Sequence, residues 1–146
     1  MSTGKRADSE ATAESLHSAA IHLLRRLRQA DAASGLNSAR LSALSVIVFG
    51  GPITLGHLAN AEQVRPPTMT RIVNALEAKS LVTKRASASD RRTIHLSATM
   101  KGKRLLLAAR RRRIRSLARQ IAILRPHDQK NLHGAVGILN DLLRAL

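Results

Sequence analysis

Apolar residues recur three, four and seven positions apart along most of this chain, which is the spacing of helices that bury one face. This spacing predicts helices over residues 14–30, 38–48, 66–79, 99–124 and 126–145. Residues 1–13 are small and polar, and we expect them to form a flexible tail. The remaining stretch, residues 14–146, has the length of one domain with a single core.

Proline and glycine mark the breaks between the helices in the middle of the chain. Gly50-Gly51-Pro52 ends the second helix, and Thr54 is placed to cap a short helix after it. Residues 62–64 make a brief break, and Pro66-Pro67 opens the next helix, since proline is tolerated in a first turn.

The helix that begins at Pro66 has two different faces. Its buried stripe is expected to consist of Met69, Ile72, Val73 and Leu76. Its opposite face carries small groups and one arginine: Pro67, Thr70, Arg71, Asn74 and Ala78. Two short helices, a tight break and such an exposed face are typical of a helix-turn-helix.

A β-hairpin is predicted directly after this unit. Residues 81–85 and 93–96 are rich in strand-forming residues, and the second run alternates polar and apolar positions. The polar residues between them form the turn. The predicted fold is therefore mainly α with a small β-hairpin wing: a winged helix-turn-helix lobe over residues 38–98, with helical dimerisation segments over residues 14–36 and 100–146.

The amino-acid composition limits the classes of function that the chain can have. A formal net charge of +16 on 146 residues indicates a polyanionic partner. The absence of cysteine excludes disulfides, thiolate zinc sites and cysteine redox sensing. One Phe, with no Tyr or Trp, argues against an RNA-binding sheet of stacked aromatic residues, and 44% hydrophobic residues argues against a disordered polycation.

The positive charge is concentrated in residues 91–127, which contain no acidic residue. The basic residues beside the hairpin are expected to face DNA: Arg91, Arg92, Lys101, Lys103 and Arg104. The run Arg110–Arg113 lies well inside the long helix, where a solvated helix face is the simpler interpretation. Some of these four arginines are expected to pair with an acid of a neighbouring helix or subunit: Asp31, Glu14 or Asp141.

Other kinds of chemistry find little support in the sequence. It shows no nucleophile–base signature, phosphate-binding glycine loop or paired-carboxylate motif, so we expect neither an enzyme nor a cofactor. The six histidines have no compact metal-ligand spacing. There is no secretory signal and no apolar run as long as a membrane span, so we expect a cytoplasmic chain without a membrane partner.

Three stretches of the chain resemble the helix-turn-helix of MarR-type transcription regulators. They are Leu58-Ala59, Val64-Arg65-Pro66-Pro67-Thr68-Met69-Thr70-Arg71-Ile72-Val73 and Leu76-Glu77-Ala78-Lys79-Ser80-Leu81-Val82. Asp90-Arg91-Arg92 resembles the family's Asp-x-Arg wing, and Ala98-Thr99-Met100-Lys101-Gly102 its Leu-Thr-x-x-Gly entry into the next helix. The resemblance covers roughly residues 14–146. Three features depart from it. Arg65 stands where a Ser or Thr cap is usual, and Ser80 stands where a glycine usually ends the helix. The Ala98-Thr99 pair adds a residue to the usual Leu-Thr step.

The resemblance implies an obligate homodimer that represses transcription from a pseudo-palindromic operator. The apolar stripes of the first and last two helices exceed what one small lobe can cover, which also indicates an interface. We assign the interface to Leu16, Leu23, Ile114, Leu117, Ile121, Leu132, Leu139 and Leu143. The resemblance further implies a small aromatic or anionic effector, bound between the dimer helices and the DNA lobe.

Within each half of such a dimer, the second helix of the motif would enter the major groove through Pro67, Thr68, Thr70, Arg71 and Asn74. Arg71 can fork onto guanine O6 and N7 or clamp a phosphate, and Asn74 can pair with adenine. In the wing, Arg92 and Arg91 would reach the minor groove, and Asp90 would either orient Arg92 or simply form the turn.

Phosphates would be contacted by Lys84, Arg85, Lys101, Lys103 and Arg104, which position the protein without reading bases. The high charge leaves an alternative open, namely an architectural DNA-binding protein with low sequence specificity.

Overall fold

The structure is a computed structural model that describes residues 2–87 and 93–146. Its elements in chain order are α1 (Ser2–Gln29), a 3₁₀ turn η1 (Ala32–Ser34), α2 (Ser38–Gly50), β1 (Ile53–Thr54), α3 (Leu55–Ala61), α4 (Pro66–Ala78), β2 (Val82–Ala86), β3 (Ile94–Ala98), α5 (Met100–Ala122) and α6 (Pro126–Ala145). The mainly helical fold with a small β-wing is therefore confirmed.

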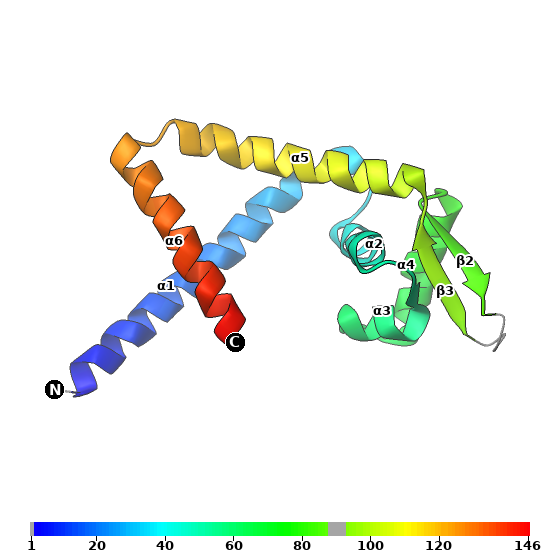
Figure 1. The fold of residues 1–146 in the computed structure, drawn as a ribbon, viewed down its shortest axis with the longest axis horizontal. Helices are drawn as coiled ribbons and strands as arrows, with labels where there is room; N and C mark the ends of the chain where they lie inside the picture. The colour runs from blue at the N-terminus through cyan, green and yellow to red at the C-terminus, as the bar shows by residue number, and fades with distance from the viewer. Residues whose placement is uncertain (1, 88–92) are drawn as a thin grey trace.

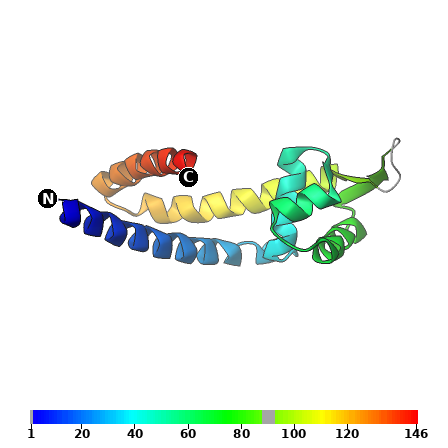
Figure 2. The ribbon, with the colours of Figure 1, turned by 90° about the horizontal axis from the view of Figure 1, so that it is seen from below.

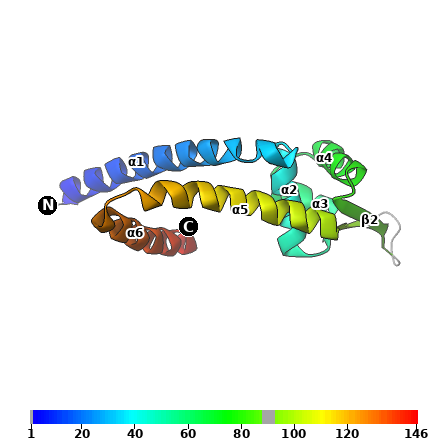
Figure 3. The same ribbon diagram turned by 90° about the horizontal axis from the view of Figure 1, so that it is seen from above.

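A lobe and three long helices make up the molecule (Figure 1). The lobe holds α2, α3, α4 and the strands, and α5 leads away from it as one long helix. Figures 2 and 3 show α1 and α6 on opposite sides of α5; α1 reaches away from the lobe, and α6 folds back from the far end of α5 and ends short of the lobe. The two ends of the chain thus lie far from the wing.

Local sequence signals explain where most of the helices begin. The side chains of Asn37, Thr54 and Thr99 accept hydrogen bonds from the first-turn amides of α2, α3 and α5. Helices α4 and α6 instead begin with proline and have no side-chain cap, so their first turns rely on the fixed φ of proline. At the end of α2, Gly51 adopts a φ of 73°, a conformation that glycine reaches without strain.

The sheet has the strand order β1-β3-β2 with antiparallel neighbours. Strand β1 was not predicted, because two residues are too few to show an alternation. It pairs Ile53 with Leu96 and Thr54 with His95, and so ties β3 to the start of α3.

The core lies in the lobe and at the lobe end of α5. Within the predicted stripe of α4, Met69, Val73 and Leu76 are buried and Ile72 is half-buried. They pack in one cluster with residues of α2, α3, both hairpin strands and the first half of α5, among them Leu44, Leu58, Leu81, Leu96 and Leu106. The lobe is therefore a packed unit that can hold α4 rigidly.

The N-terminal segment differs from expectation. Residues 2–13 were predicted to be a flexible tail, whereas the structure places them in the first half of α1. Half of these twelve residues are strong helix formers (three Ala with one Lys, one Arg and one Glu), and they extend the helix that the apolar repeat predicts from residue 14. The side chains described in this half, from Arg6 to Ala13, are all exposed.

One of the four arginines in the run 110–113 is held by a buried acid. Arg113 Nε and Nη2 each donate to the Asp31 carboxylate at 2.6 Å, in a two-pronged contact between α5 and the turn after α1. The Asp31 side chain is 3% exposed and that of Arg113 is 38% exposed. The predicted pairing with Asp31 is thus confirmed, and it fixes α5 against the chain segment that enters the lobe.

Replacing Arg113 by methionine is expected to lower the free energy of unfolding by about 2 kcal/mol. The buried Asp31 carboxylate would lose its cation, and solvent access from the Arg113 side keeps the cost below that of a fully buried pair. Arg111→Met, at an exposed position of the same helix, should change the free energy by about 0.5 kcal/mol or less. Equal urea-unfolding curves for the two variants would show that the pair contributes nothing.

The described residues show neither a metal site nor a membrane-spanning helix. No group of three or more His, Asp or Glu side chains within residues 2–87 and 93–146 is arranged to hold a metal ion. No single helix in those residues is long and apolar enough to cross a membrane, although Arg6–Ser34 together with Ser38–Gly50, bent by 84°, meets the length and composition criteria as a pair.

Candidate nucleic-acid interface

Helix α4 presents the predicted contact residues on its outer side. Burial of Met69, Val73 and Leu76 fixes the rotation of the helix, because these residues occupy one face. Pro67, Thr70, Arg71 and Asn74 lie on the opposite face and are exposed, with Thr68 exposed beside them. The Arg71 side chain has no bonding partner within the described residues and is free to reach a ligand.

The exit of α4 is fastened to the entry of α5. Thr99 N donates to Leu81 O at 3.0 Å, and Thr99 Oγ1 donates to Ser80 O at 2.8 Å while it accepts from Gly102 N at 3.0 Å. Lys101 Nζ donates to Lys79 O at 2.8 Å. These bonds fix the start of α5 against the end of α4. The departure at Ser80 is visible here, because this serine adopts a φ of 58° where glycine would be unstrained.

The predicted phosphate contacts fall into two groups. Arg85, Lys103 and Arg104 are exposed, and no side-chain partner is found for them in residues 2–87 and 93–146. Lys101 and Lys84 instead have partners inside the protein, a helix-end carbonyl for Lys101 and the Glu77 carboxylate, at 2.7 Å, for Lys84. Lys84 also donates to Asn74 Oδ1. These contacts could not be predicted from the sequence, since they join residues of different elements.

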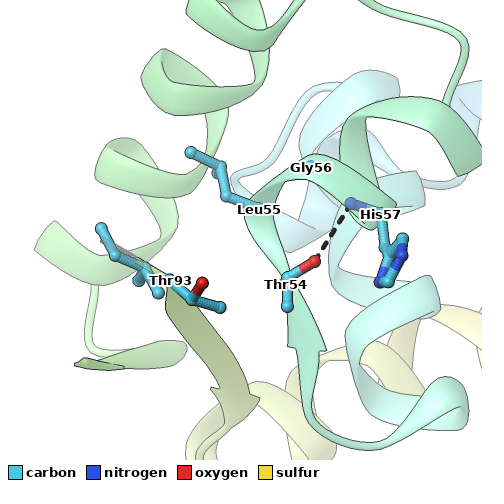
Figure 4. Close-up of a pocket in the computed structure, with 6 residues that line it drawn as sticks. Thr54, Leu55, Gly56, His57 and Thr93 are labelled. Carbon is cyan, nitrogen blue, oxygen red and sulfur yellow. Dashed lines mark hydrogen bonds between the residues drawn. The ribbon is translucent and has the colours of Figure 1, made fainter. Parts of the chain in front are cut away.

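The wing strands are part of the described structure, but the predicted tip contacts are not. Asp90, Arg91 and Arg92 lie outside the described residues. Beside the wing, a hollow of about 540 Å³ separates the start of α3 from the start of β3. Figure 4 shows Thr54 and His57 on one side of it, joined by their capping hydrogen bond, and Thr93 on the other. His57 is exposed there and is not among the contact residues predicted from the sequence.

An arginine-lined hollow of about 530 Å³ lies away from α4, between the end of α1 and the middle of α5. Arg112, Arg115 and Arg119 line it together with Ser116, and Ala30, Ala32 and Ala33 leave it open. Arg112 Nε is buried and has no hydrogen-bond partner within the described part of the chain. None of the described acidic side chains lines this hollow.

Comparisons with known proteins agree with this geometry. The family model described as "MarR family" matches residues 36–94. The HTH-type transcriptional regulator Mb0904 of Mycobacterium bovis is 35% identical over 133 residues, which are 90% of this chain and 93% of that protein. ML2140 of Mycobacterium leprae, also described as an HTH-type transcriptional regulator, is 33% identical and covers 93% of this chain and 96% of its own length.

Solved structures show the same fold. The transcriptional regulator Tm0710 of Thermotoga maritima superposes with a TM-score of 0.78 at 22% identity, covering 93% of this chain and 96% of its own. The F27L mutant of MepR from S. aureus, bound to an oligodeoxyribonucleotide, superposes with a TM-score of 0.70 at 16% identity, covering 90% and 97%. At such identities the likeness concerns the fold alone.

Proposed function

The chain belongs to the MarR family and is a DNA-binding transcriptional regulator, and on this premise we propose that it represses transcription by binding a pseudo-palindromic operator as a homodimer. The observation that carries the proposal is the exposed face of α4, on which Arg71 and its neighbours stand clear of the packed lobe. A helix held in this way fits the major groove. Its partner is double-stranded DNA, which favours a cytoplasmic location.

The long helices support the homodimer. Of the predicted interface residues, Leu16, Leu117 and Leu139 are half-buried and the others are exposed: Leu23, Ile114, Ile121, Leu132 and Leu143. Side chains of this size, repeated along three helices, form an apolar surface that a second copy would cover. A twofold axis through these helices would place two α4 helices about one DNA turn apart, roughly 10 bp.

The proposed contacts within each half-site are assigned to the side chains that are exposed to solvent. Arg71 is proposed to read guanine, with Pro67, Thr68 and Thr70 close to the base edges. Arg85, Lys103 and Arg104 are proposed to bind phosphates directly. Lys84 and Lys101 would use N–H groups that their internal partners leave free, since an ammonium has three donors.

The wing proposal rests on the sequence, as Asp90, Arg91 and Arg92 are outside the described residues. We propose that Arg92 and Arg91 enter the minor groove beside each α4.

Operator binding is expected to weaken steeply with salt. The three cations without an internal partner, Arg85, Lys103 and Arg104, would alone release about six counterions from a dimer, which gives a log–log slope of about −5 or steeper. Lys103→Met should reduce the magnitude of this slope by about 2, because each dimer loses two phosphate contacts. Fluorescence anisotropy titrations at salt concentrations from about 50 to about 300 mM measure both slopes. A flat response would contradict the phosphate assignment.

An effector is proposed to bind the arginine-lined hollow and to lower operator affinity. A buried N–H left without a partner costs about 1–3 kcal/mol, and an anion would satisfy Arg112 Nε. By linkage, such a ligand must bind the DNA-free protein more tightly. Thermal-shift titrations with aromatic carboxylates and with inorganic phosphate test this, and Arg112→Met should remove the shift. No shift at millimolar concentration would contradict an effector of either kind.

The architectural alternative is not favoured, since the matching relatives are transcriptional regulators. Specific regulators typically bind their site at least about 10³-fold more tightly than other DNA. We expect this ratio, and an architectural protein would fall well below it.

A further inference from the structure

The side chain of Lys84 connects the wing to the recognition helix α4. Its Nζ lies 2.7 Å from Glu77 Oε2 and donates to Asn74 Oδ1, so one ammonium bridges two positions of α4. The Lys84 side chain is 25% exposed. It lines a hollow of about 40 Å³ with Val73, Ile94 and Leu96, and the Glu77 carboxylate fixes its charged end. Lys84 is therefore held in place before DNA binds.

This bridge determines which way the Asn74 amide points. A lysine ammonium has three donors and no acceptor, so the amide atom that faces it must be the oxygen. The amide nitrogen, on the other side of the same planar group, is then turned away from Lys84. Asn74 itself is exposed on the outer face of α4, so this nitrogen and its two N–H groups are accessible.

The bases differ in what they require from such a group. Adenine presents an acceptor at N7 and a donor at N6, so a bidentate amide must supply both a donor and a free acceptor. Asn74 Oδ1 already accepts from a cation, and that positive charge repels the adenine N6 donor. Guanine presents two acceptors, N7 and O6, with no donor beside them. Thymine presents one acceptor, O4, and cytosine presents a donor.

We propose that Asn74 reads guanine and not adenine, because Lys84 occupies its oxygen and leaves donors facing the major groove. This inference rests on the proposed function, since it concerns how the operator is read. It replaces the adenine pairing expected from the residue type alone. Lys84 is the positioning residue, and Glu77 holds Lys84.

The experiment selects bound sequences from a random duplex library with the full-length protein. The position read by Asn74 is the one whose preference disappears in Asn74→Ala. The wild type should favour guanine over adenine there by about tenfold. Lys84→Met keeps the aliphatic stem but frees the amide oxygen, and should move the preference toward adenine by about fivefold or more. Glu77→Gln, which releases the ammonium, should shift it in the same direction by a smaller factor.

Arg85→Met is the matched control, since it removes a neighbouring cation of β2 that does not contact Asn74. It should weaken binding to all sequences without changing the preference. Melting temperatures of each variant verify that the lobe is folded. Preference for adenine, thymine or cytosine in the wild type would overturn the inference, as would an unchanged preference in folded Lys84→Met and Glu77→Gln. Failure to select any motif would instead overturn the proposed sequence-specific function.

Discussion

Arg71→Ala is expected to weaken specific operator binding strongly while leaving the protein folded. A bidentate arginine–guanine contact is worth about 1–3 kcal/mol of discrimination, and a dimer makes it twice, so affinity should fall by at least about 30-fold. The fold should be unaffected, because Arg71 is exposed and its side chain bonds to no described residue.

Arg28→Ala is the control for charge alone, since this exposed arginine lies in the last turn of α1, away from α4. It removes the same charge and should reduce operator affinity by about threefold or less, through general attraction only. Gel-shift titrations on operator and on scrambled DNA separate the two effects. If Arg71→Ala weakens binding to both DNAs equally, then Arg71 is a phosphate clamp and not a base reader.

Gly102→Ala is expected to destabilise the lobe by about 3 kcal/mol or to prevent folding. A Cβ atom at this position would lie 2.1 Å from Leu81 O and 3.3 Å from Leu44 Cδ1. The first contact is with backbone, which cannot move aside without breaking the bonds between Thr99 and the end of α4. Overpacking of this kind typically costs about 1–3 kcal/mol, and a backbone clash lies at the upper end.

Gly134→Ala is the matched control in α6, where an added Cβ would meet nothing within 4 Å. There the substitution should stabilise the protein by about 0.5–1 kcal/mol, because alanine has the higher helix propensity. Urea unfolding followed by circular dichroism measures both values. Equal stability of the two variants would show that the close approach of α5 to the backbone of Leu81, just before β2, is not required.

Residues close to the helix ends were sufficient to predict the order of the helices and strands. Proline fixed the start of α6 at residue 126, Thr54 and Thr99 capped the helices that follow them, and the two prolines of α4 replaced a cap. These features depend on neighbours within four residues, which a sequence displays directly. The exposed face of α4 could be predicted for the same reason, since one helical repeat determines both of its faces.

Contacts between elements could not be predicted in the same way. Lys84 was assigned to a phosphate, but the hairpin register places it opposite Leu96 and within reach of α4, where Glu77 binds it. The bonds from Lys101 and Thr99 to the end of α4 likewise depend on how α5 crosses the lobe. The Asp31 pair was predicted only as one of three choices, because charge complementarity alone does not select a partner.

The most direct measurement combines a hydroxyl-radical footprint on the operator with native mass spectrometry of the complex. Two protected patches about one DNA turn apart, with two chains on one duplex, are expected if a twofold pair inserts both α4 helices. A single protected patch bound by one chain would show that the long apolar helices do not join two subunits across DNA.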